Sequence, residues 1–321
     1  MSLKQSSAIS REATATSSVL LDRIIGAAIM VFVIGSIWAA IAPVHSGPQV
    51  ISQILLIASM AVLLVGHMIK HLGPVLLIAF IGTAAVMEWA FEQTNISNGG
   101  FIWGDLRYGA SAILGPHIGD VPVAVPLMMA GILWPTYVCV NLLIDGKVMV
   151  DPRTRTWWEN VWRCALYGFV HSWYMFVFNG LCEQWGLYRW VGSSMDYSAA
   201  DMAFGDPRAP IGWAIYVFVA MLIFTFVMIP LLGKDAVARA RKSPLAWVDA
   251  APVVFIAIMG IQVFLNPVNR SVGNVAMWTL GFFGLTVGLR FVGLMRAQRA
   301  AVTVPDTPKE LSDEGAARDG V

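Results

Sequence analysis

The chain of 321 residues is 57% hydrophobic and only 13% charged, with a mean hydropathy of +0.68. Soluble domains carry about 25% charged residues, so this composition indicates a membrane protein. The formal net charge of +1 comes with no patch of interleaved basic and aromatic residues. Nucleic acid needs such a patch, so a nucleic-acid partner is excluded.

A helix needs about 20 mainly apolar residues to cross the hydrocarbon core of a membrane. The sequence predicts eight such segments, at 22–43, 50–69, 73–92, 122–144, 162–183, 211–232, 247–266 and 273–295. Only helices and closed barrels satisfy the backbone in lipid, and runs of this length exclude a barrel. We therefore expect an all-α polytopic bundle at 21–298, after a polar segment at 1–20 and before a disordered tail at 299–321.

The basic residues are distributed unevenly over the predicted connectors. Seventeen of the 21 Lys and Arg residues fall on the side that holds both termini, and only Arg107, Arg189, Arg208 and Arg270 fall on the other. The positive-inside rule then predicts a multi-pass protein with both termini in the cytoplasm. An even number of crossings follows, and the connectors 93–121 and 184–210 face outward.

These two outward connectors resemble each other. Glu92-Gln93 before the first is echoed by Glu183-Gln184 before the second, and Gly119-Asp120 by Gly205-Asp206. A parallel two-helix repeat would place Glu92 and Glu183 at equal depth on neighbouring helices, although a match this short also arises by chance.

Several predicted membrane helices carry polar stripes, which normally face the interior of a bundle. Glu88 and Glu92 are one turn apart on the third segment and share a face. Ser172, Asn179 and Glu183 form a stripe on the fifth, with His171 beside it. Tyr137 and Asn141 align on the fourth.

Two interpretations of these polar residues stay open. A protonated carboxyl group in an apolar setting can donate a proton while a second, ionised one polarises water. Aromatic rings then stabilise a carbocation, and those available are Trp89, Trp103, Tyr108, Trp173 and Trp185. Alternatively, the polar groups hold helices together and the aromatic residues form the interfacial belt.

Nothing in the sequence indicates a cofactor. The three cysteines form no CxxC pair, and we read the five histidines as scattered, so we expect no metal site. A glycine-rich dinucleotide motif and a P-loop are also absent.

From Glu88 to Tyr137 the chain resembles the integral-membrane carotenoid biosynthesis family, which includes the carotenoid hydratases of bacterioruberin-type and myxol-type pathways. The matching positions are Glu88, Thr94, Trp103-Gly104, Tyr108, Leu114-Gly115 and Val121-Pro122 with Pro126. In the second half, Asn179 stands where the family has an acid, and Glu183 is a substitute one turn further on.

The resemblance implies a cofactor-independent enzyme of the bacterial inner membrane that acts on a long isoprenoid or carotenoid. Acid-initiated addition of water to a terminal alkene is the expected reaction, and cyclisation or isomerisation begins from the same protonation. We expect Glu88, Glu92 and Glu183 to be catalytic. Substrate-binding residues are expected at Thr94, Trp103, Tyr108, Tyr137, Asn141, His171, Trp173 and Asn179. The alternative is a non-catalytic transporter or lipid-binding membrane protein.

Overall fold

The computed structural model describes residues 3–43, 46–102, 104–109, 114–175, 177, 187–190, 208–265 and 270–303. The α-helices are α1 Leu3–Ile41, α2 Gly47–Leu72, α3 Pro74–Ser97, α4 Ala124–Asp145, α5 Trp157–Ser172, α7 Ala209–Ile223, α8 Ile229–Leu232, α9 Lys234–Lys242, α10 Ala251–Leu265, α11 Arg270–Ala276 and α12 Phe282–Thr303. Two π-helical turns, Phe224–Met228 and Met277–Gly281, join α7 to α8 and α11 to α12.

Seven stretches of helix are long and apolar enough to cross a membrane. They are Val19–Ile41, Gly47–Leu72, Pro74–Ser97, Ala124–Asp145, Ala209–Leu232, Trp247–Leu265 and Gly273–Ala301. These confirm an all-α, multi-pass architecture and correspond to seven of the eight predicted segments. The remaining prediction, 162–183, extends into residues outside the described ones; its described part is α5, which begins earlier than expected, at Trp157.

A capping box sets the start of α5. The Thr156 hydroxyl accepts a hydrogen bond from the Glu159 backbone N–H, and the Glu159 carboxylate accepts one from the Thr156 N–H. This arrangement satisfies two helix-end donors at once. Trp157 and Trp158, which follow it, are about two-thirds exposed, as aromatic residues at a membrane interface are.

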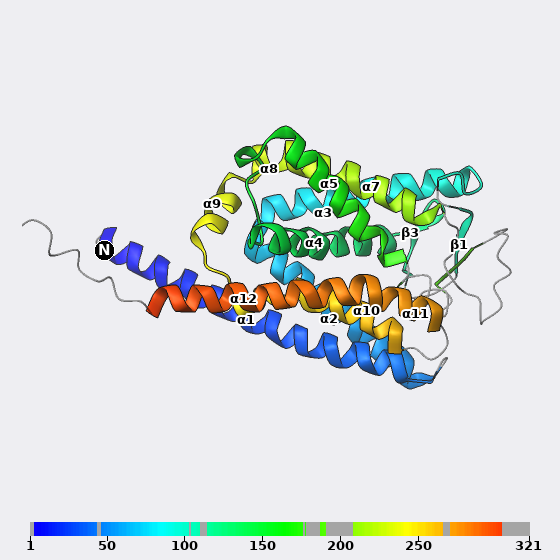
Figure 1. The fold of residues 1–321 in the computed structure, drawn as a ribbon, viewed down its shortest axis with the longest axis horizontal. Coiled ribbons are helices and arrows are strands. Elements are labelled where there is room, and N and C mark those ends of the chain that lie inside the picture. Colours follow the sequence, from blue (N-terminus) through cyan, green and yellow to red (C-terminus); the bar gives the residue numbers. More distant parts are fainter. Residues whose placement is uncertain are drawn as a thin grey trace, which may run out of the picture.

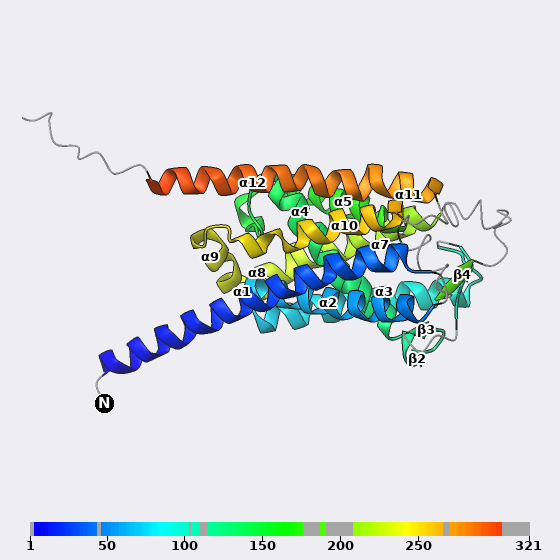
Figure 2. The ribbon, with the colours of Figure 1, turned by 90° about the horizontal axis from the view of Figure 1, so that it is seen from below.

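The long helices run side by side, and α4 lies in their midst (Figures 1 and 2). It packs against α3 and α5 on one side and against α2, α10 and α12 on the other. Small residues bring helices close together elsewhere: at Gly168 of α5 a Cβ atom would lie 2.4 Å from the Ala214 carbonyl oxygen of α7. Such contacts are the usual way for membrane helices to associate.

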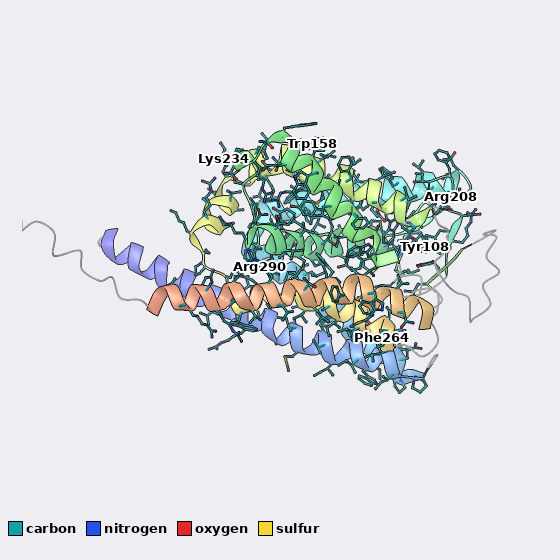
Figure 3. The ribbon with its side chains drawn as sticks, viewed as in Figure 1. Tyr108, Trp158, Arg208, Lys234, Phe264 and Arg290 are labelled. Atoms are coloured by element: carbon teal, nitrogen blue, oxygen red, sulfur yellow. The ribbon has the colours of Figure 1, made fainter. Side chains whose placement is uncertain are left out.

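The two ends of the bundle differ. The first and last described residues lie at one end, together with α9, whereas the strands lie at the other (Figures 1 and 2). Lys234 and Arg290 lie toward the α9 end, and Tyr108 and Arg208 toward the strand end (Figure 3). The ends of the described chain and the basic helix α9 thus lie at the same end of the bundle, as the distribution of Lys and Arg predicts. The polar segment expected at 1–20 is helical from Leu3 onward and continues into the first span.

Short strands join the connectors at the strand end. Strand β1, Leu106–Tyr108, pairs antiparallel with β4, Tyr188–Trp190, so the connectors that hold these strands are hydrogen-bonded to each other. Strands β2, His117–Ile118, and β3, Val121–Pro122, form a hairpin. Its two-residue turn begins at Gly119, whose φ of 66° is accessible mainly to glycine.

Candidate functional site: a buried carboxyl pair on α3

The inward face of α3 changes from apolar to acidic along its length. Its buried residues repeat every three or four positions, as one face of a helix does, and are Leu76, Phe80, Ala84, Glu88, Glu92, Asn95 and Ile96. The two glutamates therefore follow directly on an apolar stripe and point into the protein rather than toward headgroups. This confirms that the stripe of Glu88 and Glu92 faces the bundle interior.

Glu88 is 0% exposed and Glu92 is 1% exposed. Neither carboxyl oxygen of Glu88 has a hydrogen-bond partner among the described residues. Glu92 accepts a hydrogen bond from the hydroxyl of Tyr108. An isolated buried carboxylate is costly, and two such charges one turn apart repel each other. Glu88 is consequently best described as a carboxylic acid, and Glu92 as the group that an O–H donor stabilises.

Tyr108 reaches Glu92 because the connector folds back onto the end of α3. The buried Asn95 side chain donates to the Gly104 carbonyl at 2.8 Å and accepts from the Ile102 N–H at 2.8 Å. One residue beyond Tyr108, the Gly109 N–H bonds to the Leu187 carbonyl, which continues the β1–β4 pairing. Burial and the nearby Glu92 carboxylate raise the pKa of the Tyr108 hydroxyl well above 10, so it remains a proton donor.

The next face of α3 holds the β2–β3 hairpin. The Trp89 indole N–H donates to the Ile118 carbonyl at 2.9 Å. The Gln93 side chain accepts from the Asp120 N–H at 2.8 Å and donates to the Asp120 carboxylate at 3.0 Å. Both folded parts of the connector 93–121 are thus anchored on α3, and the Asp120 side chain bonds to Gln93.

Helix α7 packs against α3 beside the carboxyl pair Glu88 and Glu92. The hydroxyl of the buried Tyr216 donates to the Ala84 carbonyl at 2.9 Å, one turn before Glu88. The Tyr216 ring also contacts Phe91, with ring centroids 6.0 Å apart. Sequence reasoning missed Tyr216 and Asn95; a polar residue among apolar ones in α7, and an Asn one turn after Glu92, were the available signals.

Several of the other predicted site residues do not contact the carboxyl pair. Thr94 is exposed, and its carbonyl accepts a bond from Asn98. Trp173 packs edge-on against Phe169 and against Phe283 of α12. Buried His171 lies 3.3 Å from the Thr136 hydroxyl and contacts the Trp213 ring of α7. Trp103, Asn179 and Glu183 lie outside the described residues.

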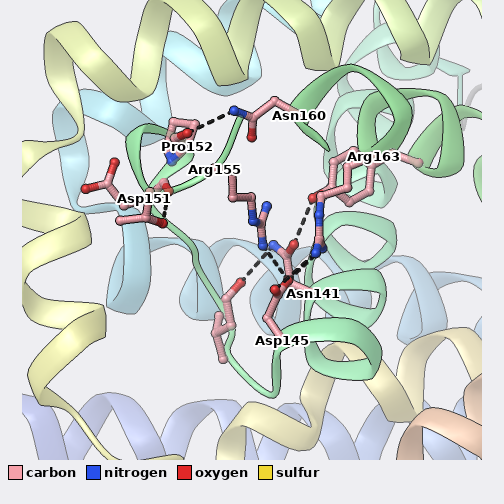
Figure 4. Close-up of polar contacts among 10 residues, drawn as sticks. Asn141, Asp145, Asp151, Pro152, Arg155, Asn160 and Arg163 are labelled. Carbon is pink, nitrogen blue, oxygen red and sulfur yellow. Dashed lines mark hydrogen bonds and ion pairs between the residues drawn. The ribbon is translucent and has the colours of Figure 1, made fainter. Parts of the chain in front are cut away.

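Tyr137 and Asn141 contribute to a polar network toward the α9 end of α4, away from Glu88. Asn141 accepts a hydrogen bond from the Tyr167 hydroxyl at 2.8 Å, and Tyr137 stacks on Trp134. One turn on, Asp145 takes two bonds from Arg163, at 2.7 and 3.2 Å, and a further one from Arg155 (Figure 4). The structure therefore does not bring Tyr137 and Asn141 together with the carboxyl pair.

A second buried cluster joins α2 to the start of α10. His67 and His71 lie one turn apart on α2. The expectation that all five histidines are scattered is therefore wrong, and the HxxxH spacing in the sequence was the available signal. Their Nε2 atoms lie 3.5 and 2.8 Å from one Asp249 oxygen. The Trp134 indole N–H donates to His67 Nδ1 at 2.9 Å.

The direction of that bond decides what the cluster holds. Indole N–H is only a donor, so Nδ1 of His67 carries a lone pair and the ring proton sits on Nε2, facing Asp249. Metal-binding histidines show the opposite arrangement, with the distal nitrogen donating outward. The three residues could reach a common metal ion. With this tautomer the His67 N–H faces Asp249 at 3.5 Å, whereas His71 lies at hydrogen-bond distance from it.

The chain was compared with known proteins: no family model, no curated protein and no solved structure matches it.

Proposed function

We propose that this protein is a membrane enzyme that protonates a terminal alkene of a long isoprenoid or carotenoid, with Glu88 as the acid. The observation that carries the proposal is the fully buried Glu88, whose oxygens have no hydrogen-bond partner among the described residues. A carboxyl group that only held helices together would be hydrogen-bonded to one of them. An unengaged acid in an apolar setting is suited to give its proton to an apolar ligand.

The two carboxyl groups divide the reaction between them. Glu88 transfers its proton to the CH carbon of the trisubstituted terminal alkene and leaves a tertiary cation on the dimethyl-substituted carbon. Water adds to the cation, and Glu92, oriented by Tyr108, takes the proton that the water releases. The product is a tertiary alcohol, and return of that proton to Glu88 completes the cycle. Loss of a proton, or ring closure, from the same cation gives isomerisation or cyclisation.

Aromatic groups near the pair suit a cationic intermediate. Tyr216 and Phe91 lie within one turn of the acids along α3, and π faces stabilise positive charge. The resemblance of residues 88–137 to the carotenoid biosynthesis family supports a polyene as substrate. The excess of Lys and Arg at the α9 end supports an orientation with both termini in the cytoplasm, in a bacterial inner membrane. The carboxyl pair then lies toward the outer leaflet.

The test is expression of the full chain in cells that make lycopene or another acyclic carotenoid. We expect a product heavier by one water, or an isomer of unchanged mass, detected by liquid chromatography and mass spectrometry. Glu88→Gln removes the acid while keeping the shape, so product should fall about a hundredfold or more. Glu159→Gln is the matched control, because Gln serves equally in the capping box of α5. Full activity of Glu88→Gln would show that the acid is misassigned.

A carboxyl pair inside a membrane bundle also suits proton-coupled transport. If no acyclic substrate is converted and the cells instead export the carotenoid in a Glu88-dependent way, the transporter reading replaces the enzymatic one.

A further inference from the structure

A basic cavity of about 300 Å³ opens at the α9 end of the bundle, opposite the carboxyl pair. It lies between the last turn of α2, the turn after α4, helix α9 and the segment before α10. The charged and titratable residues that line it are Lys70, His71, Lys147, Arg239, Arg241 and Asp249. Four cationic side chains thus face one carboxylate, so the lining is net positive.

The single carboxylate in the lining is already engaged. One oxygen of Asp249 lies 2.8 Å from His71 and 3.7 Å from Lys70, and the other accepts the Ala246 N–H at 2.8 Å. Lys70 is also paired with Asp22 at 3.0 Å. Arg241 donates to Asp151 at 2.6 Å, outside the lining. These pairs hold the wall of the cavity in place.

Lys147 and Arg239 are different, because the side chain of neither has a hydrogen bond or ion pair among the described residues. They come from separate elements, the turn after α4 and helix α9, and meet at the same cavity. The turn is fixed by Gly146, whose φ of 66° ends α4 in the left-handed conformation. Two unpaired cations on a preformed wall leave the cavity with charge that only an anion can neutralise.

We propose that this cavity binds a phosphate group, with Lys147 and Arg239 as its two principal ligands. Arg offers a planar fork and Lys a point charge, and both are suited to phosphate oxygens. The site is independent of the function proposed for Glu88, since helix α9, which lines the cavity, lies at the end of the bundle opposite the strands (Figure 1).

The position of the cavity favours a phosphate carried by a lipid headgroup. Helix α9 turns away from the direction of the long helices at the end of the bundle (Figure 1), with its basic residues Arg239, Arg241 and Lys242 in the last turn. Basic pockets between membrane helices on the cytoplasmic side typically hold anionic headgroups. A soluble phosphate or diphosphate has the same recognition chemistry and is the second source that the experiment distinguishes.

The experiment uses the purified full chain in uncharged detergent and compares two probes. In the first arm, native mass spectrometry measures retention of phosphatidylglycerol against phosphatidylcholine. In the second, calorimetry measures binding of inorganic phosphate and diphosphate without lipid. The double variant Lys147→Gln/Arg239→Gln is compared with Lys242→Gln, which removes an exposed cation of α9 that does not line the cavity.

We expect the wild type and Lys242→Gln to retain phosphatidylglycerol preferentially and the double variant to bind it roughly tenfold more weakly or worse, since two charge-assisted bonds are lost. Phosphate or diphosphate binding that the double variant alone loses, without lipid preference, would assign the site to a soluble ligand. Equal behaviour of the double variant and Lys242→Gln with every probe would overturn the proposal. All substituted side chains are exposed, so melting temperatures should agree; if the double variant melts early, Lys147→Gln alone gives the same comparison.

Discussion

At the α9 end of the bundle, the carboxylates Asp145, Asp151 and Asp249 each face a Lys or Arg side chain, whereas at the strand end Glu88 and Glu92 face none among the described residues. Asp151 shows what the first arrangement does: hydrogen bonds from Arg153 hold its pKa below the ordinary value. A carboxylate with such partners stabilises the fold. Glu88 and Glu92 are more deeply buried than Asp145 and lack a cationic partner among the described residues, and the variants below test what this difference does.

The largest expected loss of unfolding free energy is at the α9 end, where the carboxylates are paired with cations. Asp145→Ala leaves Arg155 and Arg163, which are only 12% and 10% exposed, facing each other without a counter-charge. Removal of one partner from a buried ion pair costs about 3 kcal/mol or more in unfolding free energy. Equilibrium unfolding in mixed micelles measures this loss.

Asp105→Ala is the control for this prediction, because its partner Arg107 is 46% exposed and such surface pairs contribute about 0.5 kcal/mol. Equal losses for the two variants would remove the distinction between structural and unpaired acids.

A smaller effect is expected at Tyr108. Tyr108→Phe removes the donor to Glu92 and should cost about 1.5 kcal/mol, because a buried acceptor loses its partner. The raised pKa of Tyr108 also predicts a pH dependence. Its contribution is complete below the unfolded tyrosine pKa of about 10 and is lost as the pH rises above that value.

Unfolding measured between pH 7 and 11 tests the sign. The wild type should lose stability above pH 10 more steeply than Tyr108→Phe. Parallel curves for the two proteins would show that the hydroxyl is not buried against Glu92.

The smallest effect on stability is expected where the effect on activity is greatest. Glu88 has no hydrogen-bond partner among the described residues, so Glu88→Gln should change the unfolding free energy by no more than about 0.5 kcal/mol. A loss comparable with that of Asp145→Ala would show that Glu88 holds the fold together.

Much of the fold could be predicted, because a membrane helix is specified by local composition. The apolar runs gave seven spans close to their observed bounds. The start of segment 162–183 was harder to predict, because α5 is the most polar of the long helices. It begins with Trp157 and Trp158, which the hydropathy pattern did not include.

The site was predictable only in part. Helical spacing was enough to put Glu88 and Glu92 on one face, but nothing in the spacing of α4 showed that Asn141 would bond to Tyr167 at the far end of the bundle. Contacts between distant segments were out of reach for the same reason. Tyr216 on Ala84 and Asp249 on His71 each join residues more than 130 positions apart.

The β1–β4 pair has one further consequence. It aligns Tyr108 with Tyr188, eighty positions away in the chain. The position of the Tyr108 hydroxyl beside Glu92 therefore rests on β4, which follows α5 in the chain, as well as on the Asn95 contacts at the end of α3. The three-residue ladder thus ties the position of this phenol to both long connectors.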